Sequence, residues 1–239
     1  MSKLEVRVLS AKGSESSSFV SPTVSYIRIM IEAGDVFQPV DGLPEDLVLT
    51  SLQVMKFSGG YLTVGDEPNF DWPGFKNAVD HYPKDDLTLD KYNQSTINQQ
   101  TQDVDSMVNK VATFLHDAFS AAVELDQLRA IILNTFTNLR ESSDSGFLQF
   151  SSSSEKHNSS WEYRVLFSVP FGQNAPSYFY SLVTTIKITA DIVEESSWWG
   201  LSSSTKQNFG AQIDGMELVV KKGFKAPLWS VSSGLVLSF

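Results

Sequence analysis

The residues best suited to acid–base or metal chemistry are three histidines, His81, His116 and His157, which lie far apart in the chain. The chain has no cysteine, so a zinc site would depend on these histidines and on carboxylates. His116 precedes Asp117 on the flank of an expected helix, where a surface pair is the simpler interpretation. No nucleotide-binding loop, serine-hydrolase elbow or metalloprotease motif is present. The sequence therefore predicts no catalytic, cofactor-binding or metal site, and no enzyme.

A basic cluster stands out because the chain as a whole is acidic, with a net charge of −10 and a pI near 4.7. This balance argues against broad binding to nucleic acid, which requires a cationic surface. The cluster consists of Lys221, Lys222 and Lys225. One interpretation is contact with lipid headgroups or anionic glycans, since each lysine contributes on the order of 1 kcal/mol near an anionic surface. The other is a solvated end of a strand.

Two further features are compatible with a membrane surface. Trp198 and Trp199 lie in a serine-rich loop, and tryptophan favours the headgroup zone of a bilayer. Partial burial of this pair is the competing interpretation. Lys187 falls on the polar side of an alternating stretch, where it either lines a pore or simply faces solvent.

The element that must position these residues is a long strand expected over Tyr178–Val193. Its alternate residues are mostly apolar on one side and mostly polar on the other, which is the period of a strand with one buried face. A tilted strand needs about 9–11 residues to cross the hydrocarbon of a bilayer. The stretch is therefore long enough to be the central strand of a sheet or a membrane-spanning strand.

Similar alternation predicts strands over Trp161–Phe171, which would form a hairpin with the long strand, and over Ile213–Phe224. A less regular stretch, Asp86–Asn98, is also expected to be a strand. Together these strands supply the candidates for membrane insertion, which are Trp161, Tyr163, Val165, Phe167, Val169, Tyr180, Leu182, Ile186, Lys187, Ile188, Ile192, Met216, Leu218 and Val220.

Apolar residues at steps of three and four predict amphipathic helices over Gln102–Val123 and Glu124–Arg140, joined as a helical hairpin. Thr101 is the expected N-cap of the first helix. An earlier helix is predicted over Pro44–Phe57. The inward faces of the hairpin are candidates for a helical lid or for oligomerisation, namely Val104, Val108, Val111, Leu115, Leu128, Ile132 and Phe136.

Helices and strands are segregated along the chain, which predicts an α+β fold with helices layered on a largely antiparallel sheet. We expect one domain over residues 1–239. Residues 1–22 form an N-terminal arm that can detach, residues 44–140 a mainly helical layer, and residues 146–224 the long-strand half that meets the membrane. No secretory signal and no apolar stretch long enough for a transmembrane helix are visible.

Three blocks resemble a known family in order and spacing. They are Ser106–Val111, the hexapeptide Asn134–Leu139 (NTFTNL) at the end of the second helix, and Tyr163–Phe167. In these blocks the chain is similar to the Cyt-type cytolytic δ-endotoxins of bacteria, a family that extends to the mushroom cytolysin volvatoxin. The similarity covers about Thr96 to Ala190.

The resemblance implies a three-layer α/β/α sandwich in which helical hairpins wrap a central sheet. It also implies lysis of target cells through direct lipid binding, with no protein receptor. Family members are released as water-soluble proteins, and many form dimers through swapped N-terminal strands and are activated by proteolytic trimming. Residues 1–22 match such an arm by position.

We therefore expect a cytolysin that binds membrane lipid, self-associates into oligomers and permeabilises the target cell, after release without a visible signal peptide. The alternative is a soluble module that binds lipid or anionic glycans without inserting. A hydrolase with a site built from scattered polar residues has no support in the sequence. No cofactor and no nucleic-acid partner are expected.

Overall fold

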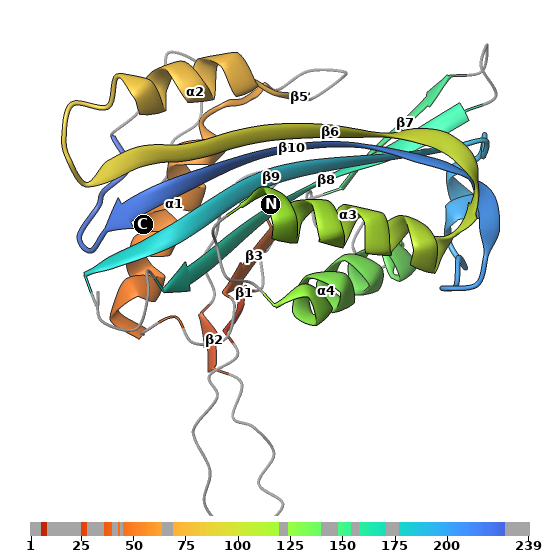
Figure 1. The fold of residues 1–239 in the computed structure, drawn as a ribbon, viewed down its shortest axis with the longest axis horizontal. Helices are drawn as coiled ribbons and strands as arrows, with labels where there is room; N and C mark the ends of the chain where they lie inside the picture. The colour runs from red at the N-terminus through yellow and green to blue at the C-terminus, as the bar shows by residue number, and fades with distance from the viewer. Residues whose placement is uncertain are drawn as a thin grey trace, which may run out of the picture.

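The computed structural model describes residues 6–8, 25–27, 36–39, 43, 45–63, 69–119, 124–139, 148–153, 158–170 and 177–227. Its centre is a six-stranded sheet in the order β3-β8-β9-β10-β6, with β7 beside β8 (Figure 1). The strands are β3 (Val36–Pro39), β6 (Leu87–Asp103), β7 (Leu148–Ser153), β8 (Asn158–Pro170), β9 (Tyr178–Ala190) and β10 (Lys206–Lys221).

All pairings in this sheet are antiparallel except that of β3 with β8, so the largely antiparallel sheet predicted from the sequence is confirmed. β8 and β9 form the expected hairpin, with Trp161 opposite Ile188 and Phe167 opposite Leu182. One edge of β8 is shared, because β7 pairs with its first half and β3 with its second. β9, the long alternating strand, lies between β8 and β10 and so has strand neighbours on both sides.

Helices cover both faces of the sheet, which confirms the three-layer α/β/α architecture (Figure 1). On one face lie α3 (Val104–Ala118) and α4 (Leu125–Thr137). On the other lie α1 (Glu45–Gly59) and α2 (Trp72–Asp80). α2 begins where the Asp71 side chain accepts a hydrogen bond from the Gly74 N–H over 3.0 Å, with proline in the first turn.

Two small sheets lie outside the central one. β1 (Val6–Val8) pairs with β2 (Ser25–Ile27), and β4 (Leu62–Thr63) pairs with β5 (Asn69–Phe70), both antiparallel. Of the predicted arm over residues 1–22, only β1 lies within the described residues.

The sheet separates two hydrophobic cores, one under each pair of helices. The α3/α4 core contains the inward faces of both helices and the residues of β8, β9 and β10 that point toward them. The α1/α2 core contains side chains from both helices and from the opposite face of the sheet. A polar, solvated second face was predicted for the Tyr178–Val193 strand. That prediction is wrong for the half of β9 under α1 and α2, where Phe179, Ser181 and Val183 are buried.

Candidate functional site

The α3/α4 layer and the sheet surface beneath it form the candidate site. Every residue predicted for the inner face of the helical hairpin is buried there. These residues are Val104, Val108, Val111 and Leu115 on α3, and Leu128, Ile132 and Phe136 on α4. Their spacing places them on one side of each helix, so the layer meets the sheet almost entirely through apolar contacts.

The sheet surface under these helices carries most of the predicted insertion candidates. Trp161, Val165, Phe167, Val169, Leu182, Ile186, Ile188 and Ile192 are all buried in the α3/α4 core, and Tyr180 packs at its margin. The side chain of Tyr163 lies outside the described residues. Met216, Leu218 and Val220 belong instead to the α1/α2 core on the opposite face. The candidates therefore do not share a single face of the sheet.

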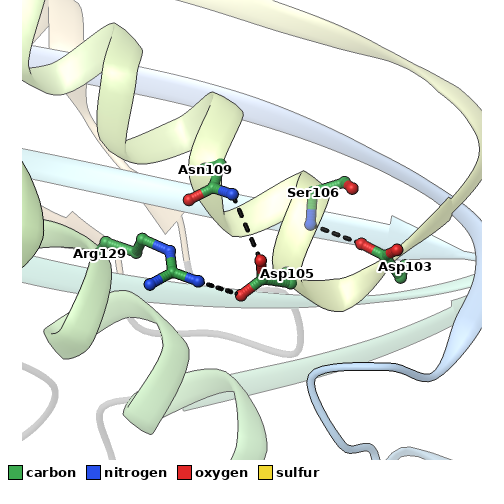
Figure 2. Close-up of polar contacts among 5 residues, drawn as sticks. All are labelled: Asp103, Asp105, Ser106, Asn109 and Arg129. Atoms are coloured by element: carbon green, nitrogen blue, oxygen red, sulfur yellow. Dashed lines mark hydrogen bonds and ion pairs between the residues drawn. The ribbon is translucent and has the colours of Figure 1, made fainter.

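α3 follows β6 without a connecting loop, because β6 ends at Asp103 and α3 begins at Val104. Asp103, and not the predicted Thr101, is the N-cap, and its carboxylate accepts a hydrogen bond from the Ser106 N–H over 2.7 Å (Figure 2). Hydrogen bonds from the Ser106 side chain and backbone hold the pKa of the Asp103 carboxyl below its usual value.

The same end of α3 is fastened to the β9–β10 connection. The Val104 N–H donates to the Thr205 carbonyl over 3.1 Å, and the Asp105 N–H donates to the Ser203 carbonyl over 3.0 Å. These bonds use two of the N–H groups that a helix leaves without partners in its first turn. The N-terminal end of α3 is therefore fixed to β6, which it continues, and to the connection between β9 and β10.

An ion pair joins α3 to α4. The Arg129 guanidinium lies 2.5 Å from an Asp105 carboxylate oxygen, and Asn109 donates to the other oxygen over 3.4 Å (Figure 2). Both charged side chains are more than a third exposed, so the pair contributes at most about 1 kcal/mol. It ties the two helices together.

The C-terminal end of α3 rests on a position of the sheet that lacks a side chain. A Cβ added to Gly215 would lie 2.6 Å from the Phe119 ring, so only glycine leaves room for this ring. Nearby, the Asn93 amide donates to the Ala118 carbonyl over 2.8 Å. α3 is thus attached to the sheet by polar or close steric contacts at both ends. Between them the interface is apolar except for one hydrogen bond from Lys110 to the Gln102 side chain of β6, over 2.7 Å.

Comparison with known proteins identifies this arrangement. A family model described as Bacillus thuringiensis toxin matches residues 69–231, which include α2, α3, α4 and β6 to β10. The chain belongs to this family of Cyt-type δ-endotoxins. No curated protein sequence matches the chain.

Two solved structures share the toxin fold. A δ-endotoxin superimposes with a TM-score of 0.70 at 18% identity, over 89% of this chain and 94% of the other. The activated Cyt2Ba monomer from Bacillus thuringiensis subsp. israelensis gives a TM-score of 0.67 at 14% identity, over 80% and 98%. At these identities the likeness concerns the fold, and it agrees with the helices and antiparallel sheet described above.

The adjacent residues Trp198 and Trp199 of the toxin have different environments. Trp198 is buried, packs against Phe136 and Phe209, and donates through its ring nitrogen to the Ser159 hydroxyl over 2.7 Å. The interpretation of Trp198 as an interfacial anchor therefore does not fit this structure, because the indole is part of the α3/α4 core. Trp199 is 37% exposed at the surface of the same loop.

The basic cluster of the toxin lies at the end of β10. Lys222 and Lys225 are exposed, whereas Lys221 is half-buried, 3.8 Å from an Asp85 carboxylate and 6.0 Å from the centre of the Tyr178 ring. Only part of the cluster is thus presented to a large ligand. Lys187 lies on the face of β9 away from α3 and α4, opposite Glu162 of β8.

The histidines of the toxin do not converge. His81 lies against the Asn77 carbonyl at the end of α2, and His116 pairs with Asp117 on the exposed side of α3. His157 lies outside the described residues. In the described part of the chain, no group of three potential metal-ligating side chains is found, and no helix has the length and hydropathy of a membrane span.

Three contacts of the site were not predicted from the sequence, namely the Asp103 cap, the Asp105–Arg129 pair and the Phe119–Gly215 contact. The first had a local signal, since an acidic residue three positions before Ser106 is a common helix start. The others join residues 24 and 96 positions apart in the chain, so no local pattern indicates them.

Proposed function

We propose that this toxin is a cytolysin that binds membrane lipid directly, assembles into oligomers and permeabilises the target cell. The observation that carries the proposal is the apolar sheet surface beneath α3 and α4. When the helices move away, this surface has the composition needed to contact acyl chains. The toxin would be released as a water-soluble protein and act at the target membrane.

The energetics favour a membrane-triggered change. Fully burying one large apolar side chain contributes about 1.5–3 kcal/mol. Exposing eight such side chains of the sheet to water would cost about 12–24 kcal/mol, which is at least comparable to the total stability of about 5–15 kcal/mol expected for a domain. These eight are Trp161, Val165, Phe167, Leu182, Ile186, Ile188, Phe209 and Ile213. The helices therefore stay in place in water and separate only where lipid replaces them.

Unpaired backbone groups at the edges of inserted strands favour self-association. Strands that enter lipid as a lone hairpin leave N–H and C=O groups at their edges unpaired, at a cost of several kcal/mol per group. Pairing with strands of neighbouring copies removes this cost by closing the sheet. We therefore expect oligomers in the membrane. A second mechanism, in which α3 and α4 lie as amphipathic helices at the interface, is an alternative for the lesion.

Dye release from protein-free phospholipid vesicles tests the proposal. We expect the purified toxin, with and without limited proteolysis, to release an encapsulated dye in a dose-dependent manner. Binding to the vesicles without release would instead support a soluble lipid-binding module. Binding only to anionic glycans would support the glycan-binding version of that module. Intact vesicles at every dose, pH and proteolytic treatment would contradict a cytolytic function.

A further inference from the structure

β6 forms one edge of the central sheet (Figure 1). It has 17 residues, more than any other described strand, and within the described part of the chain it pairs with β10 alone. An edge strand points alternate N–H and C=O groups away from its sheet, and these groups can pair with a strand of another molecule. The outer side of β6 is therefore a possible surface for strand pairing.

The opposite edge of the sheet is built differently. It consists of β3 and β7, which have four and six residues and lie beside different parts of β8. Short edge strands are one of the devices by which proteins prevent unwanted pairing between sheets. β6 lacks this protection, so it is the edge that suits a partner.

The neighbouring helices meet β6 from the two faces of the sheet. Trp72, at the start of α2, donates to the Thr185 hydroxyl of β9, which lies two strands in from the edge. On the other face, the Asn93 side chain of β6 donates to the Ala118 carbonyl at the end of α3. The start of α2 and the end of α3 thus lie over the sheet and leave room beside its edge.

The composition of β6 also favours pairing. The eleven residues Tyr92–Gln102 include no charged residue, no glycine and no proline, although the whole chain carries a net charge of −10. Proteins commonly protect an edge strand with lysine or proline. In β6 the nearest charges are Lys91 and Asp103, one on each side of this neutral run. Two copies can therefore approach along it without opposing like charges.

Two irregularities delimit the part of β6 with unbroken register. The pairing with β10 shifts at Asp90 and again at Asn98 and Gln99. Between them, Lys91–Ile97 pairs residue by residue with β10. Neutral segments of six or seven residues with polar amides and no proline are those that pair most readily with copies of themselves. We call Lys91–Ile97 the pairing segment.

The geometry of an antiparallel sheet restricts how two pairing segments can meet. Two identical antiparallel strands are related by a two-fold axis perpendicular to the sheet, which keeps each residue on the same face in both copies. Directly opposite residues must also point to the same face. Successive residues alternate between the faces, so one residue has to lie opposite its own copy. For the pairing segment, the central residue is Gln94.

We propose that the outer edge of β6 binds a second copy of this chain in water, with the two strands antiparallel and Gln94 opposite Gln94. The dimer joins two six-stranded sheets into one continuous sheet. Its surface is separate from the arm over residues 1–22. The inference goes beyond the proposed cytolytic function, because it requires neither a membrane nor lysis.

The side chains of the pairing segment are compatible with this register. Asn93 faces Ser95 of the second copy, Tyr92 faces Thr96, and Lys91 faces Ile97. An amide offers both donors and an acceptor, so Gln94 can bond to its own copy, and aromatic residues pair well with β-branched ones across strands. Gln94 is exposed, and its amide donates to the Tyr92 hydroxyl over 2.9 Å. The two Lys91 side chains are kept apart by this register.

Single cysteines test the register, since the native chain has none. In Gln94→Cys the two thiols are opposite each other, and we expect mild oxidation to give a disulfide-linked dimer as the main product. In Asn93→Cys and Ser95→Cys, identical residues are offset by two positions, which separates their Cα atoms by more than about 7 Å and prevents a disulfide. Lys84→Cys, at an exposed position before β6, should stay monomeric under the same oxidation. Equal cross-linking of all four variants would overturn the register.

Charge exchange at the axis tests the interface without a covalent bond. By sedimentation in lipid-free buffer, we expect the wild type to move from 26.5 kDa toward twice that mass as its concentration rises. Gln94→Lys alone and Gln94→Glu alone oppose like charges across the axis, so each should lose the dimer. An equimolar mixture of the two should regain it. Gln100→Lys adds the same charge at an exposed position beyond the second irregularity, and it should still dimerise.

The outcomes separate this inference from the proposed function. A wild type that stays monomeric at every concentration, or a dimer that persists in Gln94→Lys and Gln94→Glu, would contradict the β6 interface. Melting temperatures near that of the wild type show that the variants are folded, and recovery in the mixture excludes a folding defect. All of these measurements are made without lipid, so their failure leaves the dye-release test of the cytolysin unaffected.

Discussion

The two helical layers cover the same sheet but are attached to it in different ways. The α1/α2 core is organised around aromatic rings, with Phe57 contacting Tyr61, Phe75, Tyr82 and Phe224 at centroid distances of 5.6–6.1 Å. Phe224 comes from the segment that follows β10, so this core interlocks residues from widely separated parts of the chain. The α3/α4 core is mainly aliphatic, and its rings form smaller groups, such as Phe114 with Phe119 and Phe136 with Trp198 and Phe209.

Polar contacts reinforce this contrast. Near the middle of α1, Thr50 accepts a hydrogen bond from the Gly223 N–H and Gln53 accepts one from the Ala226 N–H, each over 3.3 Å. The Trp72 ring nitrogen of α2 donates to the Thr185 hydroxyl in the sheet over 3.1 Å. α3 has most of its corresponding contacts at its two ends, and near its middle Lys110 donates to the Gln102 side chain of β6 over 2.7 Å. An interface held by these few polar contacts separates once they are released, and we take this difference to distinguish the mobile layer from the fixed one.

The largest expected effect comes from holding α3 down. In the double variant Asn93→Cys/Ala118→Cys, a short reducible bis-methanethiosulfonate linker joins two positions whose side chain and carbonyl already lie 2.8 Å apart. α3 is then pinned at both ends, and we expect vesicle lysis to be abolished until the linker is reduced. The measurement is dye release before and after reduction.

The matched control links the other layer. Gln53→Cys/Ala226→Cys joins α1 to the segment after β10, where the native atoms lie 3.3 Å apart. Because α1 and α2 stay in place in our account, lysis should continue with this linker intact. Undiminished lysis by the linked Asn93/Ala118 protein would show that α3 need not leave the sheet.

A smaller effect is expected from overpacking beneath α3. In Gly215→Val, the added atoms meet the Phe119 ring, and overpacking of this kind costs about 1–3 kcal/mol. The end of α3 is pushed off the sheet, so we expect a lower melting temperature together with faster lysis of vesicles. Both are measured on the same preparation.

The variant Phe75→Leu distinguishes a general loss of stability from a disturbed contact between Phe119 and residue 215. Phe75 is buried at the centre of the α1/α2 core, so its truncation also lowers the melting temperature. It leaves α3 undisturbed and should not accelerate lysis. Equal acceleration by both variants would mean that general instability, and not release of α3, sets the rate.

Removing the ion pair between α3 and α4 should have a modest effect. Arg129→Gln abolishes the pair with Asp105, whose half-exposed side chains make it worth about 0.2–1 kcal/mol. The two helices then separate more easily, and we expect a small rise in lysis rate. Lys76→Gln removes the pair with Asp80 on α2, which has the same 2.5 Å separation and similar exposure. A rise for both variants would argue against a special role for α3 and α4.

The smallest expected effect is acid fraying at the start of α3. Since the pKa of Asp103 is lowered in the folded protein, its cap is fully present above the ordinary pKa and is lost as the pH falls through the lowered value. Hydrogen exchange should therefore show loss of protection at the Ser106 amide only in strong acid. Asp103→Asn caps the helix without titrating, so its protection should not change over that range. If protection of the Ser106 amide in the wild type does not change with pH, Asp103 does not act as a titrating cap.

The parts of the fold that follow from local periodicity were predictable. The inward faces of α3 and α4, from Val104 to Phe136, follow directly from the step of three and four, and the β8–β9 hairpin follows from alternation. The length of β6 was underestimated. The predicted strand ended near Asn98, whereas β6 continues to Asp103. Its second half is rich in Gln and Thr, and it is held in the sheet by pairing with β10 and not by its own hydrophobicity.

The parts that depend on packing between distant residues were not predictable. Met216 and Leu182 are both apolar residues of long strands, but only the sheet register places them on opposite faces. Ser181 reads as solvent-facing in the sequence, yet α1 and α2 cover that side of β9 and the residue is fully buried.

The central claim is that lipid replaces α3 and α4 on the apolar sheet surface beneath them while the α1/α2 layer stays in place. An environment-sensitive dye attached to Ile188→Cys or to Leu218→Cys tests it, with quenchers carried on the lipid acyl chains. After vesicle binding, we expect strong quenching at position 188 and none at position 218. Quenching at 218 alone, or at neither position while a dye on the inner face of α3 is quenched, would contradict it.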